Sequence, residues 1–256
     1  MSRNFELLQK IGKEQDIFEP QEILIAHDAP DSVVDNPVIL QAPVLNIEPK
    51  ELEEVTKLVQ RVFLLPGGQS PRSVVFMGTE PGNGCSWMCA RTAEVLASQI
   101  TGRVCLVDAN LREPAQHEMF GLPNDQGLSD SLRFPEPVGH FVRRLSRPNL
   151  YLVTAGSAGE NWQSLVSSDR MRLRISELRN EFDYVLIDST AMSVCNDGVA
   201  LGCASDGVVL VLKANSSRRE WARKAVHELK EARAQVLGAV LNQRTYPIPD
   251  AIYNRL

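Results

Sequence analysis

Six short runs of apolar residues alternate with stretches of helical periodicity, and this alternation constrains the fold more than any other feature of the sequence. The runs cover residues 73–77, 104–107, 150–154, 184–187, 208–212 and 236–241. Helices are expected over residues 49–65, 84–100, 171–180 and 218–234. Uninterrupted apolar strands separated by helices are typical of a parallel sheet that is covered on both faces. We therefore expect an α/β fold with three layers, in which one sheet lies between two layers of helices.

The two ends of the chain differ in composition from this central part. Residues 1–48 combine a short amphipathic pattern with a proline-rich stretch, so we expect a short helix followed by an extended linker. That helix either packs on its own domain or docks on a partner or a membrane surface. The expected α/β domain covers residues 49–244, and a tail with Tyr246 and Tyr253 covers residues 245–256.

Bulk composition excludes several classes of protein. The net charge is −5, which argues against non-specific binding of nucleic acid, because that depends on clustered Lys and Arg. There is no apolar run long enough to cross a membrane, and the first ten residues lack the pattern of a signal peptide. The five cysteines form no C-x-x-C pair, so we expect no structural zinc and a reducing, cytoplasmic location. Cys105 and Cys203 lie in apolar stretches and are expected to be buried.

A glycine-rich loop follows the first expected strand and leads into a helix. Such a loop presents backbone N–H groups at a helix N-terminus, which suits phosphate groups. Its candidate nucleotide-binding residues are Gly82, Asn83, Gly84, Cys85, Ser86 and Trp87. In a working P-loop a lysine follows the last glycine and reaches the β- and γ-phosphates, and the next Ser or Thr holds magnesium. Here Ser86 is in place, but Cys85 stands where the lysine belongs, so a glycine-rich connection without a ligand stays an open alternative.

Two carboxylates are expected at the same edge of the sheet as this loop. Asp108 and Asp188 each come at the end of an apolar run, and ligands of parallel sheets bind beyond the carboxyl ends of the strands. Together with Ser86 they can hold Mg²⁺, or one of them can accept the proton of an attacking hydroxyl. The alternative for each is a simple helix cap.

Several motifs in a fixed order resemble one protein family. They are the glycine loop, VDANLREPAQHEMFG, NDQGLSDSL, ELRNEFDYVLIDS, SDGVVLVLKANSSRR and VLGAVLNQR. Over about residues 50–256 the chain resembles the bacterial tyrosine autokinases of capsule and exopolysaccharide synthesis, which belong to the partition-type P-loop ATPases. The resemblance implies a P-loop NTPase-like fold and ATP-dependent autophosphorylation.

The resemblance also implies roles for particular residues. Asp108 would act as the base and as a metal partner, Asp188 would support Mg²⁺, and Asn242 would contact adenine. Tyr246 and Tyr253 would be the sites of autophosphorylation. The implied partners are a membrane-anchored polysaccharide co-polymerase that regulates chain length, or a related kinase, reached at the inner membrane face. A homo-oligomer is implied as well, with helix 49–65 contributing to its contacts.

Three departures from the family pattern lie at the expected nucleotide site. Cys85 replaces the phosphate-binding lysine, Asn110 replaces a second aspartate, and Thr190 replaces a proline. A neutral thiol supplies none of the positive charge that stabilises phosphoryl transfer. The cations that are candidates to replace the lysine are Arg112, Lys213 and Arg244, of which Arg112 is the nearest in sequence.

Three functions therefore stay open. We favour a degenerate kinase that acts as a regulatory or scaffolding subunit and binds ATP or ADP with Mg²⁺ weakly or not at all. The second is an active tyrosine autokinase that uses a non-standard cation. The third is a positioning ATPase of the partition type.

Overall fold

The computed structural model describes residues 48–65, 70–157, 159 and 162–244. All of these lie in one compact unit, residues 33–256. The expected N-terminal helix and the two tail tyrosines, Tyr246 and Tyr253, lie outside the described residues.

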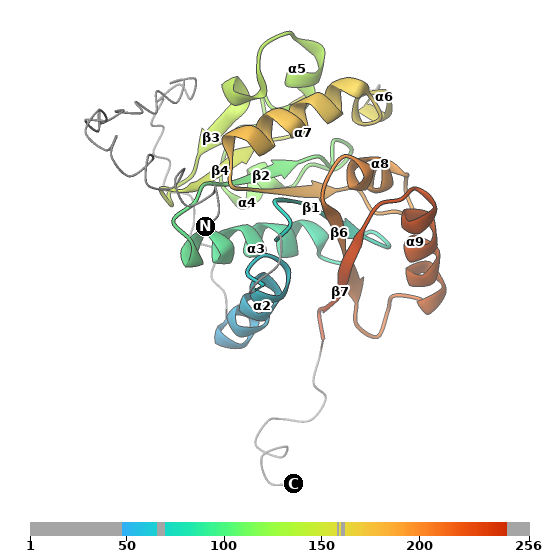
Figure 1. The fold of residues 1–256 in the computed structure, drawn as a ribbon. Helices are drawn as coiled ribbons and strands as arrows, with labels where there is room; N and C mark the ends of the chain where they lie inside the picture. Colours follow the sequence, from blue (N-terminus) through green and yellow to red (C-terminus); the bar gives the residue numbers. More distant parts are fainter. Residues whose placement is uncertain (1–47, 66–69, 158, 160–161, 245–256) are drawn as a thin grey trace, which may run out of the picture. The chain divides into compact units, whose positions relative to one another are not determined.

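Seven strands of the described residues form one sheet in the order β3-β4-β2-β5-β1-β6-β7 (Figure 1). They are β1 (Ser73–Gly78), β2 (Val104–Asp108), β3 (Val142–Arg144), β4 (Leu150–Val153), β5 (Tyr184–Ser189), β6 (Gly207–Lys213) and β7 (Val236–Asn242). All neighbours pair in parallel except β3 and β4. The parallel arrangement brings the carboxyl ends of β1, β2, β5 and β6 to one edge, which confirms the predicted fold class.

One face of the sheet is covered by α3 (Cys85–Gln99), and α2 (Pro49–Val62) packs on α3 (Figure 1). A proline at the first helical position suits the start of α2 because that position has no backbone partner for its N–H group. Val55, Val59 and Phe63 point inward and are buried. They join the apolar side chains of α3 and of β1 in one continuous core.

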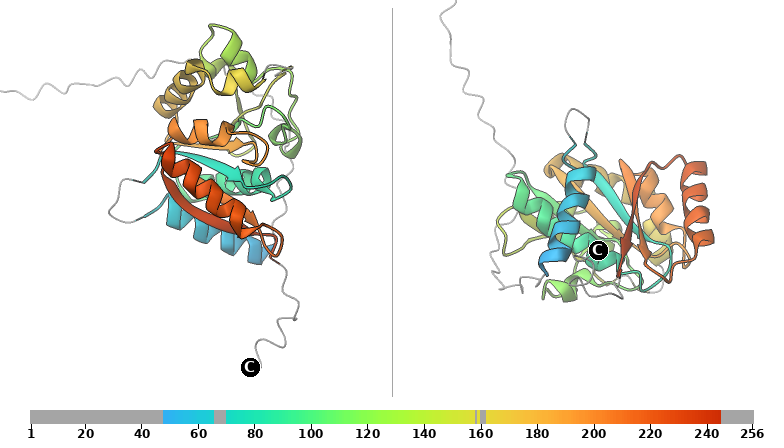
Figure 2. Two further views of the ribbon diagram at one scale, coloured as in Figure 1. Left: turned by 90° about the vertical axis from the view of Figure 1, so that its right-hand side faces the viewer. Right: turned by 90° about the horizontal axis from the view of Figure 1, so that it is seen from below.

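The opposite face is covered by helices from later in the chain (Figures 1 and 2). They are α5 (Leu128–Arg133), α6 (Trp162–Val166), α7 (Asp169–Glu181), α8 (Asp197–Cys203) and α9 (Arg219–Glu231). Two shorter pieces, α4 (Gln116–Met119) and the 3-10 helix η1 (Val138–Phe141), lie within the connection from β2 to β3. Helices on both faces of the sheet give the three layers that the sequence predicts.

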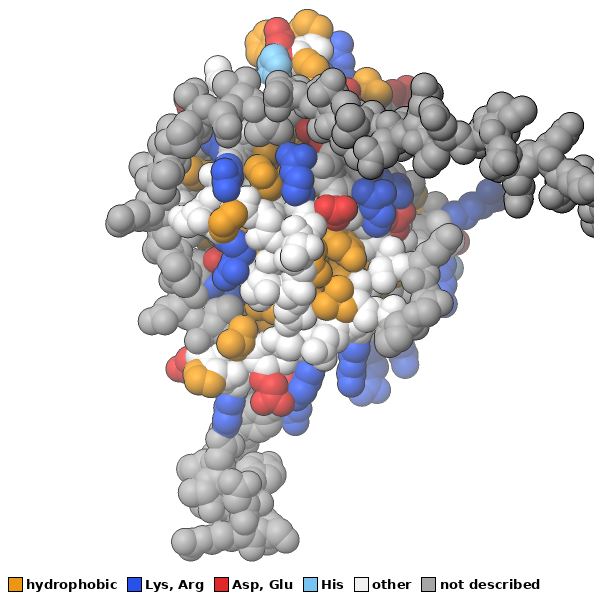
Figure 3. Space-filling view, turned by 60° about the vertical axis from the view of Figure 1, so that its left-hand side comes forward, with side chains coloured by type: hydrophobic (Ala, Val, Ile, Leu, Met, Phe, Trp, Pro, Cys, Tyr) orange, Lys and Arg blue, Asp and Glu red, His pale blue; other side chains and the backbone are white. Residues whose placement is uncertain are grey.

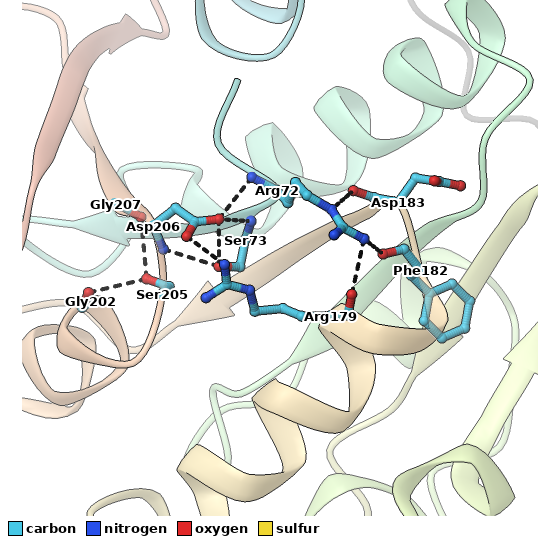
Figure 4. Close-up of polar contacts among 9 residues, drawn as sticks. All are labelled: Arg72, Ser73, Arg179, Phe182, Asp183, Gly202, Ser205, Asp206 and Gly207. Carbon is cyan, nitrogen blue, oxygen red and sulfur yellow. Dashed lines mark hydrogen bonds and ion pairs between the residues drawn. The ribbon is translucent and has the colours of Figure 1, made fainter. Parts of the chain in front are cut away.

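The edge opposite the glycine loop is fastened by a polar network (Figure 4). The guanidinium group of Arg72 donates hydrogen bonds to the carbonyl oxygens of Arg179, Phe182 and Asp183, just where α7 ends and β5 begins. The carboxylate of Asp206 accepts from the backbone N–H groups of Arg72 and Ser73, at the start of β1. The network therefore ties the start of β1 to the end of α7 and the start of β6.

One expected burial is wrong. Cys105 is fully buried in β2, as predicted, but Cys203 is exposed at the last position of α8. The preceding Leu201 and Gly202 are buried and form the inward face of this short helix, so the next position, Cys203, lies on its outer face. The thiol of Cys203 instead donates to the carbonyl oxygen of Ala232, 3.2 Å away.

Candidate functional site

The glycine loop connects β1 to α3 and takes a conformation that favours glycine. Gly82 and Gly84 have φ angles of 76° and 74°, in the left-handed region that side chains disfavour. Gly84 also lies so close to the side-chain amide of Asn242 that a Cβ atom there would collide with it. The side chain of Asn83 is buried and donates to Thr79 Oγ1 at 3.0 Å and to the carbonyl oxygen of Val211 at 3.1 Å. The loop is thus anchored to β1 and β6.

A pocket of about 390 Å³ opens beside this loop. It is bounded by the glycine loop, by the segment after β2 and by the segment after β5. Its walls include Gly82, Asn83, Gly84, Cys85, Ser86, Trp87, Asn110, Arg112, Thr190 and Ala191. Arg112 is the one Lys or Arg among the described residues that line it, and two acidic side chains, Glu80 and Glu113, line it too. Lys213 and Arg244 do not line the pocket.

Asp108 and Asp188 are direct neighbours at the carboxyl ends of β2 and β5. The structure therefore confirms that they share one edge of the sheet with the glycine loop. Both are 0% exposed, and neither lines the pocket. Burial, and then the charge of Asp188, raises the pKa of Asp108, while burial raises the pKa of Asp188 above its ordinary value. This pair therefore favours a protonated, less charged state.

The oxygens of Asp108 are already occupied by hydrogen bonds from the chain that follows β2. They accept from the backbone N–H groups of Asn110 at 3.2 Å and of Ala115 and Gln116 at 3.0 Å each. The last two are the N-cap residue and the first residue of α4. Asp108 therefore anchors the start of α4 from the end of β2, although the N-cap residue of this helix is Ala115, and its catalytic role stays a prediction.

Gln116 belongs to the site, although the sequence did not suggest it. Its side chain is fully buried and donates from Nε2 to Asp188 Oδ2 at 2.8 Å and to the carbonyl oxygen of Ser86 at 3.0 Å. It thereby joins the end of β5 to the first turn of α3. A single glutamine at the start of a four-residue helix carries no spacing signal, so only the folded chain reveals this contact.

Cys85 occupies the position expected for lysine and lies beside Asp188. Burial, together with the negative charge of Asp188, raises the pKa of the Cys85 thiol well above its ordinary value. The same two causes raise the pKa of Cys89, one turn further along α3. Cys85 is consequently a neutral thiol near neutral pH and supplies no positive charge to the pocket.

The two other departures from the family pattern meet each other. The hydroxyl of Thr190 donates to Asn110 Oδ1 at 2.9 Å, and the same oxygen accepts from the N–H group of Glu113 at 3.2 Å. A proline at position 190 has no group that can donate this bond. The paired substitutions therefore connect the segments after β2 and β5 at the mouth of the pocket.

Trp87 and Asn242 lie on different sides of the loop. Trp87 lines the pocket, with the guanidinium group of Arg91 5.3 Å from the centre of its ring. Asn242 ends β7 and does not line the pocket; its Nδ2 donates to the carbonyl oxygen of Asn83 at 2.9 Å. Its expected contact with adenine stays a prediction.

The described residues suit a phosphate group. The backbone N–H groups of residues 83–87 donate to no described residue, and the start of α3 faces the pocket, which suits an anion. Among the described residues no three or more His, Cys, Asp or Glu side chains are grouped to bind a metal by themselves, while Asp188 Oδ1 is buried without a hydrogen-bond partner and could bind a cation together with phosphate oxygens.

None of the helices in the described part of the chain is long and apolar enough to span a membrane.

Comparisons with solved structures support the fold. The chimerical protein CapA2B2 superposes with a TM-score of 0.71 at 24% identity, over 78% of this chain and 87% of that one. The cell division ATPase MinD of Pyrococcus furiosus superposes with a TM-score of 0.58 at 22% identity, over 72% of this chain and 78% of that one. These likenesses place the sheet and its glycine loop among P-loop NTPase-like folds.

Comparisons of sequence identify the family. No family model matches the chain. The tyrosine-protein kinase YwqD of Bacillus subtilis is 30% identical over 197 residues, which cover 76% of this chain and 83% of that protein. The putative tyrosine-protein kinase CapB of Staphylococcus aureus is 28% identical over 172 residues, or 67% of this chain and 75% of that protein. With the loop, the paired carboxylates and the strand order already in place, the chain belongs to the family of bacterial tyrosine-protein kinases.

Proposed function

We propose that this chain is a catalytically impaired member of its family that regulates or scaffolds the synthesis or export of capsule or exopolysaccharide. The observation that carries the proposal is the neutral thiol of Cys85, which stands beside Asp188 where a phosphate-binding lysine is expected. Its relatives are tyrosine-protein kinases, and the substitution affects the part of the site that phosphoryl transfer needs most.

The charge of the pocket explains the impairment. Phosphoryl transfer depends on positive groups that stabilise the charge on the transferred phosphate, and one missing donor costs a few kcal/mol, on the order of 2.7–4. Only Arg112 among the described lining residues is positive, and Glu80 and Glu113 face the same space. Asp108 is bound to backbone N–H groups rather than free to accept a substrate proton.

The chain's own residues still suit a weakly bound ATP or ADP, which would supply the phosphates. The N–H groups of residues 83–87 would bind a phosphate at the start of α3, and the hydroxyl of Ser86 would donate to it. Gln116 keeps Asp188 and the first turn of α3 in fixed relative positions. Binding without a lysine then rests mainly on backbone donors.

Calorimetric titration with ATP and ADP, with and without Mg²⁺, tests the proposal in the natural protein and in Cys85→Lys. We expect weak binding and no tyrosine phosphorylation by the natural protein, and at least tenfold tighter binding in Cys85→Lys. Cys203→Lys is the matched control, because it adds the same charge at an exposed position of α8 outside the pocket lining. Saturable ATP turnover or phosphorylation of Tyr246 or Tyr253 by the natural protein would overturn the proposal.

An active autokinase is the second candidate, and the position of Arg112 in the pocket wall favours it. If Arg112 replaces the missing lysine, the natural protein phosphorylates itself and Arg112→Gln abolishes that activity. If the natural protein and Arg112→Gln show the same background level of phosphorylation, the active autokinase is excluded and the impaired kinase remains. The likeness to MinD concerns the fold alone, so the positioning ATPase has no separate support.

The proposed partner is a membrane-anchored polysaccharide co-polymerase or a related kinase, met at the cytoplasmic face of the inner membrane. Support comes from the structural match to CapA2B2, a chimerical protein. The test is whether the full chain co-purifies with the co-polymerase encoded in the same cell. Comparing the natural protein with Cys85→Lys shows whether that binding depends on the nucleotide site. Failure of both proteins to bind contradicts the proposed partner.

A further inference from the structure

The sheet ends on one side at β7, and the outer edge of this strand carries no protection of its own. Among the described strands, only β6 pairs with it (Figure 1). None of the seven residues of β7 is charged, whereas β3, the strand at the opposite edge, has two arginines among three residues. Proteins usually protect an open edge with charged residues, proline or a covering segment, because an unpaired edge accepts another strand. The composition of β7 therefore indicates that a further segment covers it.

The direction of the backbone groups identifies which residues of β7 are open. Along a strand, successive residues turn their N–H and C=O groups to alternate sides. The carbonyl oxygen of Asn242 accepts from the N–H group of Ala214, directly after β6, at 2.8 Å, so Asn242 and with it Val240 face β6. Ala239 and Leu241 consequently face outward, and their N–H groups donate to no described residue. Both side chains are exposed, that of Leu241 by 57%.

The tail that follows, residues 245–256, is long enough to run back along this edge. Fully extended it spans about 40 Å, while the seven residues of β7 span about 23 Å. It carries one acidic and one basic residue, so it has no net charge to oppose contact with the uncharged strand. The chain already leaves the strand conformation at Gln243, whose φ angle of 54° is typical of a turn.

Two prolines in the tail set the register in which it can pair. A proline has no N–H group, so within an edge strand it is placed with its nitrogen facing outward. Pro247 and Pro249 are two positions apart and therefore face the same side. The N–H groups of Tyr246 and Ile248 then face the other side, where β7 lies.

This register matches the open residues of β7. Four-residue connections are common in β-hairpins, and here residues 242–245 supply one. Such a hairpin places Tyr246 opposite Leu241. It places Ile248 opposite Ala239. Paired residues lie on one face of a sheet, so each exposed apolar side chain of β7 gains an apolar neighbour.

We propose that the C-terminal tail folds back on β7 as an antiparallel strand whose prolines face outward, and that it thereby holds Tyr246 against Leu241. A tyrosine within a paired strand is not available to the active site of a kinase, so the tail must be released before Tyr246 is phosphorylated. Tyr253 follows the paired residues and is not held. This pairing does not depend on nucleotide binding, so it can fail or hold separately from the proposed function.

Amide hydrogen exchange of the full chain, resolved by residue with NMR, tests the pairing within β7 itself. We expect slow exchange at Ala239 and Leu241. Removal of residues 245–256 should speed it about tenfold, as for a pairing about as strong as one hydrogen bond. Val240 and Asn242 are the internal control, because their N–H groups face β6 and should exchange equally in both proteins.

Two proline variants test the register. Ile248→Pro removes an N–H group that faces β7, so exchange at Ala239 should rise as it does without the tail. Ala251→Pro is the matched control, because position 251 faces outward like the two natural prolines, and its exchange should match that of the natural protein. A nuclear Overhauser effect between the ring of Tyr246 and the methyl groups of Leu241 is expected in the natural protein and in Ala251→Pro.

Three results would overturn the proposal. The first is fast exchange at Ala239 and Leu241 in the natural protein, or exchange there that is unchanged without the tail. The second is protection that grows with protein concentration, which would show that a second copy of the chain covers β7. The third is an equal effect of the two proline variants, which would exclude the proposed register.

Discussion

At the scale of single residues, the candidate site lacks one positive and one negative side chain of the family pattern. Cys85 removes a positive charge that the family pattern provides, and Asn110 removes a negative one, so the net charge of the site is unchanged. The two carboxylates that remain, Asp108 and Asp188, are buried side by side and favour a bound proton.

The buried carboxylate pair should make stability depend on pH. The pKa of Asp188 is raised in the folded protein, so the folded state binds a proton more tightly than the unfolded state, whose value is near 3.8. Stability is therefore greatest below the unfolded value and falls as the pH rises through the folded pKa. In Asp188→Asn we expect a flatter decline between pH 4 and 7 and about 1 kcal/mol or more of added stability at pH 7. Urea unfolding of both proteins between pH 4 and 7 measures this difference in stability.

Asp169→Asn is the control for that measurement, because Asp169 lies at the surface in an ion pair with Arg172. Its variant should follow the pH profile of the natural protein. Parallel profiles for Asp188→Asn and the natural protein would show that Asp188 ionises freely in the folded state.

The hydrogen bond between Thr190 and Asn110 is a second feature of single residues that can be tested. Thr190→Val keeps the shape of the side chain but removes the donor, leaving Asn110 Oδ1 with only its bond from Glu113. We expect a loss of 0.5–1.5 kcal/mol of stability, roughly that of one hydrogen bond. A double-mutant cycle with Asn110→Ala should then give a coupling energy of similar size. Additive effects in urea unfolding would mean that the two side chains act independently.

The sequence predicts the residues that share an edge but not the contacts among them. Asp108 and Asp188 each follow an apolar run, and the rule for parallel sheets brings them together. Gln116, Thr190 and Gln243 have no such marker, because their contacts depend on how three separate loops fold against one another.

At the scale of elements, chemistry and stability occupy opposite edges of the sheet. The glycine loop lies where the parallel strands end, while the network around Asp206 lies where β1 and β6 begin (Figure 4). Substitutions at the edge with the glycine loop can therefore remove activity without weakening the polar network at the opposite edge. This separation explains how the chain keeps its fold with an altered phosphate loop.

Asp206→Asn should weaken the fold and spare the pocket. Burial opposes ionisation of Asp206, but the N–H groups of Ser73 and Arg72, with the charge of Arg179, lower its pKa below the ordinary value. A lowered pKa gives stability that is present above the unfolded value and lost as the pH falls through the folded value. We expect a loss of about 1–2 kcal/mol of stability at pH 7, as for charge-assisted hydrogen bonds, and a smaller difference below pH 4.

Thermal unfolding of the Asp206→Asn variant measures this loss. Unchanged ADP binding would confine the effect to this edge of the sheet. Equal stability of the variant and the natural protein at pH 7 would contradict the role of the carboxylate.

Element prediction succeeds where the apolar pattern is long. The predicted strands agree with β1, β2, β4, β5, β6 and β7 to within one or two residues. β3 has three residues, two of them arginine, and pairs antiparallel at the edge, so it carries no buried pattern. The helix α8 has seven residues and begins close to an irregular loop, and its formation depends on packing against β1 and β5.

At the scale of the whole molecule, the described surfaces differ in what they offer a partner. On the described part of the face in Figure 3, hydrophobic side chains form a small group with Lys and Arg side chains around it. Large exposed hydrophobic side chains occur singly on separate elements, among them Leu52 on α2 and Leu173 on α7. Any assembly of this chain through the described residues therefore uses mixed surfaces rather than one extended apolar patch.

The homo-oligomer implied by the family can be tested at the exposed N-terminal end of the apolar face of α2. Deleting α2 is a poor test, because Val55, Val59 and Phe63 are buried against α3 and their removal would expose its apolar side chains. Leu52 is 45% exposed and lies three residues before Val55, at the exposed start of the same apolar face of α2. If α2 joins subunits, Leu52→Glu lowers the sedimentation coefficient to that of a monomer, since a buried charge without a partner destabilises an interface.

Leu173→Glu controls for the added charge, because Leu173 is 54% exposed on the opposite layer of helices. This variant should sediment like the natural protein. A natural protein that is monomeric at every concentration, or equal behaviour of both variants, would exclude α2 as the contact and leave regulation to a partner of another kind.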